Sequence, residues 1–184
     1  MRALVVDNGS LTTMLIARRL QGLGWGATVV HHDAVKFGDV SHACDAIFLS
    51  GTDVTVTNGR FDAQLELVRK CEVPLMGICG GLHIIGRAYG VGIVKQEPVL
   101  GRTEVLLDRG ERLFSELPAS TQIFQRHSYR LQRVPDGFRR IATSHTCPVE
   151  AIAHRRRAVF GVQGHIELRA DGMRILERFL SLAS

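Results

Sequence analysis

The sequence predicts a single-domain, three-layer α/β fold with a central, mostly parallel sheet and a smaller antiparallel section. Three observations support this prediction. The 184 residues match the length of one ordinary domain. In the first half, short β-branched runs alternate with stretches of helical periodicity, which is the pattern of βαβ units. Between Val91 and Val162, short apolar runs are separated by turns, which favours antiparallel or mixed pairing. We therefore expect one domain over residues 1–184.

The elements of the first half can be placed in order from apolar runs and turn residues. Gly24 ends the first helix, and Pro74 opens the fourth strand. The third strand closes on Ser50 and Gly51. The helix before Pro74 is indicated by apolar residues at helical spacing. The predicted strands are 3–6, 27–31, 46–49 and 75–78, and the predicted helices are 11–23, 61–71 and 80–89.

The second half is predicted to consist of short strands followed by one helix. The predicted strands are 103–107, 122–124, 138–142, 149–153 and 158–162. The last helix, 172–182, places Met173, Leu176 and Phe179 on one face, together with Leu180. This face is expected to pack on the sheet as a closing helix.

The composition is that of a folded soluble protein. Apolar residues make up 45% and charged residues 22% of the chain, and its mean hydropathy is +0.07. The N-terminal run reaches Asp7 too early for the apolar core of a signal peptide, and no later run is long enough to span a bilayer. We expect a cytoplasmic protein without a membrane partner.

The net charge of +5 comes mainly from arginine. These arginines could form either an ordinary solvated surface or a docking patch. The arginines are scattered and are not interleaved with aromatic residues, so a solvated surface is favoured over a docking patch for an acidic partner. No nucleic-acid partner is predicted. The run 155–157 fits either a partner interface or a hairpin tip in water.

The four cysteines do not indicate a metal site or a disulfide framework. They are Cys44, Cys71, Cys79 and Cys147, and they lack paired C-x-x-C spacing. Three of them are expected to be small buried apolar residues. We predict neither a metal nor a cofactor.

The stretch 74–81, Pro-Leu-Met-Gly-Ile-Cys-Gly-Gly, resembles a nucleophile elbow, in which a buried strand turns sharply into a helix. Gly77 and Gly81 supply the small residues that let the strand and the helix approach closely. The helix dipole favours a thiolate at Cys79. Alternatively, Cys79 is one more buried cysteine in a glycine-rich turn.

A base for this thiol is predicted in 160–167, Phe-Gly-Val-Gln-Gly-His-Ile-Glu. His165 and Glu167 are two residues apart, so in an extended segment both point the same way. Glu167 could accept one imidazole N–H while the other nitrogen faces Cys79. A His-x-Glu pair alone is more often a surface pair; the elbow makes it a catalytic candidate.

Both motifs resemble those of class I glutamine amidotransferases. The elbow is similar to their Gly-Ile-Cys-x-Gly block, and 161–167 is similar to their Gly-Val-Gln-Phe-His-Pro-Glu block. Further likeness lies at 5–8, at 49–51 and in the tail with Gly172 and Phe179. The resemblance implies a flavodoxin-like fold and a triad of Cys79, His165 and Glu167.

The resemblance also implies the remaining parts of a glutamine site. The implied oxyanion hole consists of Gly51, Thr52 and Gly80, and the implied substrate-binding residues are His83, Gln163, Ser128 and Tyr129. Within the family, 135–138 and 147–152 are most similar to the amidotransferase part of GMP synthetase. The stretch 126–128 is equally similar to glutaminase subunits of anthranilate and aminodeoxychorismate synthases.

Four positions depart from the family pattern. His83 stands where the family has a glutamine that helps to hold the substrate, and it fits either an altered substrate pocket or a satisfied histidine on the inner helix face. Thr52 follows Gly51 where Gly-Gly-Pro is usual, which leaves the backbone donors in place. Gly164 and Ile166 replace Phe and Pro, which is expected to loosen the surroundings of His165.

The expected function is glutamine hydrolysis to glutamate and ammonia through a Cys79 thioester, with the ammonia passing to a separate synthase or synthetase subunit. A GMP synthetase-like pathway is favoured. Two alternatives keep the fold: a cysteine hydrolase or transferase for another amide or γ-glutamyl compound, and a non-catalytic regulator. The presence of Cys79, His165 and Glu167 together argues against the regulator.

Overall fold

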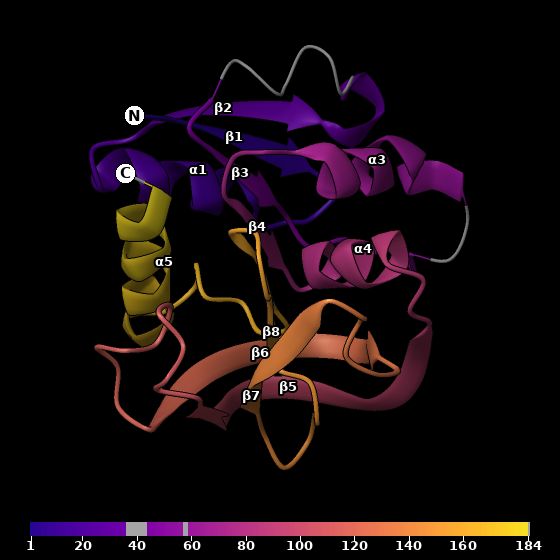
Figure 1. The fold of residues 1–184 in the computed structure, drawn as a ribbon, viewed down its shortest axis with the longest axis vertical. Helices are drawn as coiled ribbons and strands as arrows, with labels where there is room; N and C mark the ends of the chain where they lie inside the picture. The colour runs from indigo at the N-terminus through magenta and orange to yellow at the C-terminus, as the bar shows by residue number, and fades with distance from the viewer. Residues whose placement is uncertain (36–43, 57–58, 184) are drawn as a thin grey trace.

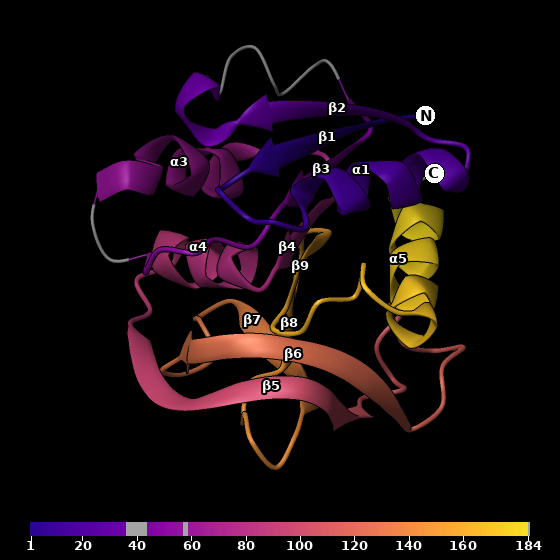
Figure 2. The same cartoon turned by 180° about the vertical axis from the view of Figure 1, so that it is seen from behind.

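A single mixed sheet organises the computed structural model, which describes residues 1–35, 44–56 and 59–183. Within these residues the sheet has nine strands in the order β2-β1-β3-β4-β9-β8-β7-β5-β6 (Figures 1 and 2). The strands are β1 (Arg2–Asp7), β2 (Gly26–His31), β3 (Ala46–Leu49), β4 (Leu75–Ile78), β5 (Ile93–Leu107), β6 (Ser120–Leu131), β7 (Phe138–Thr143), β8 (Ala151–His154) and β9 (Val159–Val162).

Helices cover both faces of the parallel part of this sheet. They are α1 (Thr13–Gly22), α3 (Asp62–Lys70), α4 (Gly80–Ala88) and α5 (Ala170–Ala183), with the short 3-10 helices η1 (His32–Ala34) and η2 (Gly59–Phe61). α1 and α5 pack on one face, where Phe48 meets Phe179, and α3 and α4 pack on the other, where Ile47 meets Leu67. Alternate residues of a strand point to opposite faces, so the fully buried strand β3 supplies both cores.

The prediction of a mostly parallel sheet is wrong, because the antiparallel section is as large as the parallel one. Among the described residues, β2, β1, β3, β4 and β9 pair in parallel, whereas β9, β8, β7, β5 and β6 pair antiparallel. The error has a physical cause. β5 and β6 are 15 and 12 residues long. β5 is buried only near its C-terminal end, and two of the buried residues of β6 are polar, so neither strand carries an apolar pattern along its length.

β9 joins the two sections and positions the candidate site. It pairs in parallel with β4, with Ile78 opposite Val162, and antiparallel with β8. The amide of Cys79 continues this ladder and donates to the carbonyl of Val162 at 2.8 Å. The chain leaving β9 therefore begins beside the chain leaving β4, which places 163–167 next to Cys79.

The arginine run at 155–157 lies in the turn between β8 and β9. Its last member, Arg157, forms hydrogen bonds within the protein. Arg157 donates to the carbonyls of Val68 and Arg69, both at 3.0 Å, and also to that of Cys71. These carbonyls belong to the C-terminal end of α3, where carbonyl groups lack helical partners. Arg157 therefore caps α3, whereas Arg155 and Arg156 are exposed.

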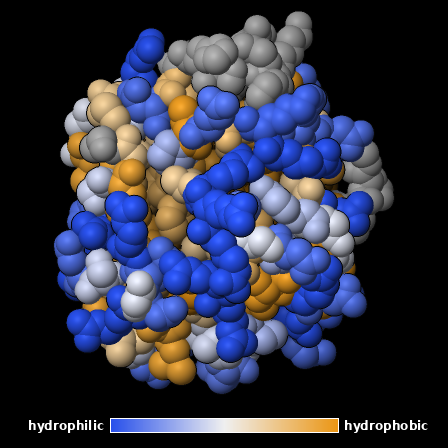
Figure 3. Space-filling view, viewed as in Figure 1, coloured by the Kyte–Doolittle hydropathy of each residue, from blue (hydrophilic) through white to orange (hydrophobic). Residues whose placement is uncertain are grey.

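The surface is mixed in character. Hydrophilic side chains are spread over the face seen in Figure 3, with smaller groups of hydrophobic residues between them. None of the helices in the described part of the chain is long and apolar enough to cross a membrane.

Candidate active site

Cys79 lies at a strained turn between β4 and α4. Its φ of 52° and ψ of −105° make it the one non-glycine residue with positive φ in the described part of the chain. L-residues avoid this region because Cβ clashes with the backbone. The turn also requires glycines: a Cβ at Gly77 would lie 2.6 Å from the backbone of Gly81, and a Cβ at Gly81 would meet the carbonyl of Leu49.

His165 and Glu167 form a buried pair. Nδ1 of His165 lies 2.8 Å from Oε1 of Glu167, and the two side chains are 7% and 0% exposed. This burial excludes the surface pair that sequence reasoning left open. The amide of His165 donates to the carbonyl of Phe124 at 2.8 Å, which ties the segment to β6. Oε2 of Glu167 is buried and has no hydrogen-bond partner.

The pair is electrostatically coupled to Cys79. Burial alone would lower the pKa of His165, but hydrogen bonds to Cys79 and Glu167, and the charges of both, raise it to about 10. An imidazole with such a pKa holds its proton at neutral pH. His165 is therefore arranged to carry a proton next to the sulfur, with Glu167 fixing the ring through Nδ1.

Two cavities meet at Cys79. The first, of about 260 Å³, is lined by Cys79, Gly80 and His83 and by 52–55 and 126–129. The second, of about 250 Å³, is also lined by Cys79 and includes Gly51 and His165. The structure places Ser128 and Tyr129, the substrate-binding residues that the resemblance implies, in the lining of the first cavity.

The loop 51–52 approaches the start of α4 closely. A Cβ at Gly80 would lie 2.5 Å from the amide nitrogen of Thr52, so only glycine fits there. Asn8 holds this loop: its amide donates to Oγ of Ser50 at 2.9 Å and its Nδ2 donates to the carbonyl of Ser50 at 3.0 Å. Backbone amides at a helix start and an adjoining loop can stabilise a negative oxygen.

His83 is both a cavity residue and a satisfied buried histidine. Its Nε2 lies 3.0 Å from Oε1 of Gln163, and Nε2 of Gln163 lies 3.9 Å from the sulfur of Cys79. Burial lowers the pKa of His83 to about 4, against hydrogen bonds to Gln163 and to the backbone of Tyr129. His83 is therefore neutral at pH 7, and it orients Gln163 toward Cys79.

His127 is a residue at the site that sequence reasoning did not single out. It lines the first cavity, its Nδ1 lies 3.1 Å from the carbonyl of Tyr129, and its Nε2 is buried without a partner. Burial, together with His83 and His165, lowers its pKa to about 4 against the Tyr129 hydrogen bond. Strand alternation could have indicated His127, because residues 127 and 129 share a face of β6. The strand predicted from the sequence, however, stopped at residue 124.

The segment around His165 is not loosened by Gly164 and Ile166. A Cβ at Gly164 would lie 2.9 Å from Nε2 of Gln125, so the glutamine side chain occupies the space next to this glycine. Gln125 donates to Oε2 of the buried Glu150 at 3.0 Å. Ile166 is fully buried, and the backbone of Gly172 at the start of α5 packs directly on it.

Comparisons with known proteins identify the family of the chain. The family model of class I glutamine amidotransferases matches residues 4–182. GMP synthase (glutamine-hydrolyzing) of Thermosipho africanus is 33% identical over 181 residues, covering 96% of this chain and 35% of the relative. The same enzyme of Aliivibrio fischeri is 30% identical over 187 residues, covering 97% and 35%. The chain thus spans about a third of these curated relatives.

Solved structures show the same fold. A candidate GMP synthase subunit from Thermoplasma acidophilum superposes with a TM-score of 0.92 at 26% identity, covering 100% of this chain and 94% of that one. A glutamine amidotransferase from Thermotoga maritima superposes with a TM-score of 0.82 at 18% identity, covering 99% and 81%. Taken with the family match over 4–182, these findings show that the chain belongs to the class I glutamine amidotransferases.

Proposed function

We propose that the chain hydrolyses the side-chain amide of glutamine and delivers the ammonia to a separate GMP synthetase-like subunit. The observation that carries the proposal is the strained Cys79, coupled to the buried His165–Glu167 pair where two cavities meet. The names of the relatives support glutamine as the substrate. Their extra length supports an ammonia acceptor outside these 184 residues.

In the first step the Cys79 thiolate attacks the amide carbon of glutamine, forming a carbon–sulfur bond. The amide oxygen takes the negative charge and is stabilised by backbone N–H groups of Thr52 and Gly80, with Gly51 shaping the hole. The intermediate collapses, the carbon–nitrogen bond breaks, and the His165 proton passes to the departing ammonia. A γ-glutamyl thioester on Cys79 remains.

In the second step water hydrolyses the thioester. Neutral His165 removes a proton from the water as its oxygen attacks the carbonyl carbon, and the carbon–sulfur bond then breaks. Glutamate leaves, and the thiolate and the imidazolium are restored. Glu167 keeps the imidazole in the tautomer that both steps require, because its carboxylate accepts from Nδ1.

The first cavity is the proposed glutamine pocket. Ser128 and Tyr129 line it beside His83, so the backbone and side chains of β6 can hold the α-amino and α-carboxyl groups of the substrate. Gln163 lies beside the sulfur of Cys79. Its Nε2 can donate to the thiolate while its Oε1 accepts a hydrogen bond from His83. His83 thus acts on catalysis through Gln163.

The proposal is tested by intact-mass analysis and peptide mapping after exposure to an electrophilic glutamine analogue. We expect one label, on Cys79, and none on the buried Cys71 and Cys147, which serve as internal controls. Iodoacetamide reports the reactivity of the same thiol. If iodoacetamide modified Cys79 and the analogue did not, Cys79 would remain the proposed nucleophile, but the assignment of the cavity as a glutamine pocket would be contradicted.

A second candidate function rests on His83 alone: hydrolysis of another amide or γ-glutamyl compound. The variant His83→Gln restores the family residue and separates the two. If the substrate is glutamine, His83→Gln keeps a donor to Gln163 and changes kcat/KM for glutamine little, while His83→Ala lowers it. A large gain in glutamine turnover in His83→Gln would favour the second function. No turnover of any amide by a chain that labels normally would favour a regulator.

A further inference from the structure

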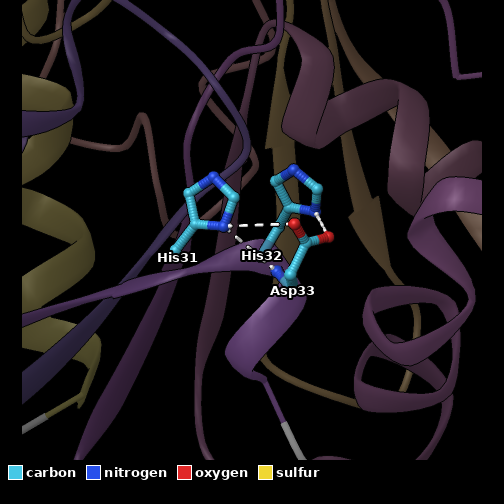
Figure 4. Close-up of side chains that lie close together, drawn as sticks. All are labelled: His31, His32 and Asp33. Carbon is cyan, nitrogen blue, oxygen red and sulfur yellow. Dashed lines mark hydrogen bonds and ion pairs between the residues drawn. The ribbon is translucent and has the colours of Figure 1, made fainter.

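His31, His32 and Asp33 form a compact group of possible metal ligands far from the candidate active site. They lie at the carboxyl end of β2 and the start of η1, and their side chains converge (Figure 4). One ligand atom from each lies within 4.8 Å of the others. β2 is the edge strand, three strand spacings from β4, so this group lies about 14 Å or more from Cys79.

Two of the distances within the group are close to those of a coordination shell. Nδ1 of His31 lies 3.5 Å from Oδ2 of Asp33, and Nδ1 of His32 lies 2.8 Å from Oδ1. Ligand atoms held about 2.1 Å from a cation lie about 3.0 to 3.4 Å from one another in octahedral or tetrahedral sites. Because the side chains of His31 and Asp33 are exposed, they are free to rotate toward this spacing.

The Nδ1 atom of His32 is a second observation that points to a ligand. The side chain of His32 is 2% exposed, and its Nδ1 contacts Oδ1 of Asp33 but makes no hydrogen bond with a described residue. Buried polar atoms are rarely left without a partner. The lone pair of Nδ1 can instead bind a metal ion.

The surroundings hold His32 in place and leave the other two ligands accessible. The backbone carbonyl of His32 accepts from Nε2 of Gln64 at 2.7 Å, and its ring packs on Phe61 with centroids 5.4 Å apart. Nδ1 of His31 accepts only a long hydrogen bond from the Asp33 amide, at 3.4 Å. The side chains of His31 and Asp33 are 55% and 70% exposed, so a cation can enter from solution.

We propose that His31, His32 and Asp33 bind one late first-row divalent cation such as Zn²⁺ or Ni²⁺, with water at the remaining positions. Two imidazole nitrogens and one carboxylate are a donor set suited to these ions, whereas Mg²⁺ and Ca²⁺ prefer oxygen ligands alone. A bound ion would tie the end of β2 to η1 and, through His32, to α3. It would stabilise this edge of the sheet without entering the reaction at Cys79.

The test measures Zn²⁺ binding to tag-free protein by equilibrium dialysis with metal analysis. All samples carry Cys79→Ala, so that the thiolate and His165 do not bind the ion. We expect one bound equivalent, and a loss of affinity of at least about tenfold in His31→Ala and in Asp33→Asn. Both residues are exposed, so these variants are expected to fold. The control His145→Ala removes an exposed histidine elsewhere and is expected to bind as its parent does.

Two further readouts keep the outcome clear. Zn²⁺ is expected to raise the Tm of the parent and of His145→Ala but not of His31→Ala or Asp33→Asn. Co²⁺ is expected to give visible bands without the intense charge-transfer absorption of a cysteine ligand. Equal binding in parent, His31→Ala and Asp33→Asn, no binding in the parent, or a thiolate charge-transfer band would each overturn the proposal.

Discussion

At the scale of single residues, the buried carboxylate of Glu167 orients the imidazole ring of His165. One oxygen holds Nδ1 of His165, and the other has no partner. In Glu167→Gln the amide can present a donor to Nδ1 and select the wrong tautomer of His165. We expect kcat for glutamine to fall about 10²- to 10⁴-fold. Steady-state ammonia release measures the loss.

The same variant has a structural control. Gln is close to Glu in volume, so circular dichroism and Tm should change little, and iodoacetamide should still reach Cys79. Retention of near-normal kcat in a folded Glu167→Gln protein would remove Glu167 from the mechanism and leave His165 oriented by its backbone alone.

His127 predicts how stability depends on pH. Its pKa is about 4 in the folded protein, against an ordinary 6.5 that the unfolded chain regains. Between these values the unfolded state binds more protons, so the free energy of unfolding is highest above pH 6.5 and falls as pH drops toward 4. In His127→Gln this fall is expected to be shallower by up to about 1.4 kcal/mol per pH unit.

Urea unfolding at several pH values between 7 and 4 measures this slope. The control is His145→Gln, whose exposed ring shares neither the burial nor the neighbours of His127, and its slope should equal that of the parent. His83 has the same shift and remains in both variants, so part of the acid sensitivity persists. A His127→Gln slope identical to the parent would contradict the assignment.

Candidate site residues can be read from the sequence where local geometry demands particular residue types. The elbow needs Gly77 and Gly81, and the His165–Glu167 pair lies two residues apart on one segment, so both are visible in the sequence. His127 and the contact between His83 and Gln163 join residues far apart in the chain. The run 31–33 is contiguous, but cysteine spacing, the pattern that argued against a metal site, carries no information about histidine and aspartate ligands.

At the scale of elements, the junction of β4 and α4 depends on backbone contact. Gly81→Ala would place a Cβ 3.0 Å from the carbonyl carbon of Leu49, with the oxygen closer still, and neither atom can move without shifting β3. We expect a loss of about 1 to 3 kcal/mol in the free energy of unfolding and weaker labelling of Cys79. Urea unfolding and the labelling assay measure the two effects.

Gly22 offers the matched control for this substitution. It lies in α1, a Cβ there would have open space around it, and its φ is not positive. Gly22→Ala is therefore expected to be neutral or to stabilise by up to about 1 kcal/mol. If Gly81→Ala were as stable as Gly22→Ala, the backbone contact between α4 and β3 would not require glycine at position 81.

Element prediction was accurate where burial was complete. Strands 46–49 and 75–78 are confirmed with the same bounds, because each is a short, fully buried run between turn residues. Strand 103–107 captured only the buried end of β5, and strand 122–124 captured a short part of β6. The remaining parts of these two strands pair with each other, and this pairing leaves no apolar pattern in either sequence.

At the scale of the whole molecule, the continuous sheet predicts cooperative unfolding of its two sections. β9 pairs with β4 on one side and β8 on the other, so neither section can lose it alone. Fluorescence of Trp25, which is buried against the parallel section, should change at the same urea concentration as far-UV circular dichroism. Hydrogen exchange of the β6 and β7 amides reports the unfolding of the antiparallel section.

Noncoincident transitions would contradict this prediction, as would early exchange of the antiparallel strands while Trp25 remained buried. The topology that makes the prediction could not be obtained from the sequence. Short apolar runs establish that strands exist, but the order β4-β9-β8 depends on which edges meet in space. Only β1 to β4 follow the alternation of strands and helices in the chain.

The place of β9 also affects how the protein is made. Ribosomes release the chain from its N-terminus, so β4 and the elbow emerge about 80 residues before the strand that completes them. Until β9 inserts, the edge of β4 is an open row of backbone donors and acceptors beside apolar side chains, and such edges recruit other chains. We therefore expect a chain that ends before β9 to aggregate more readily than the full-length chain.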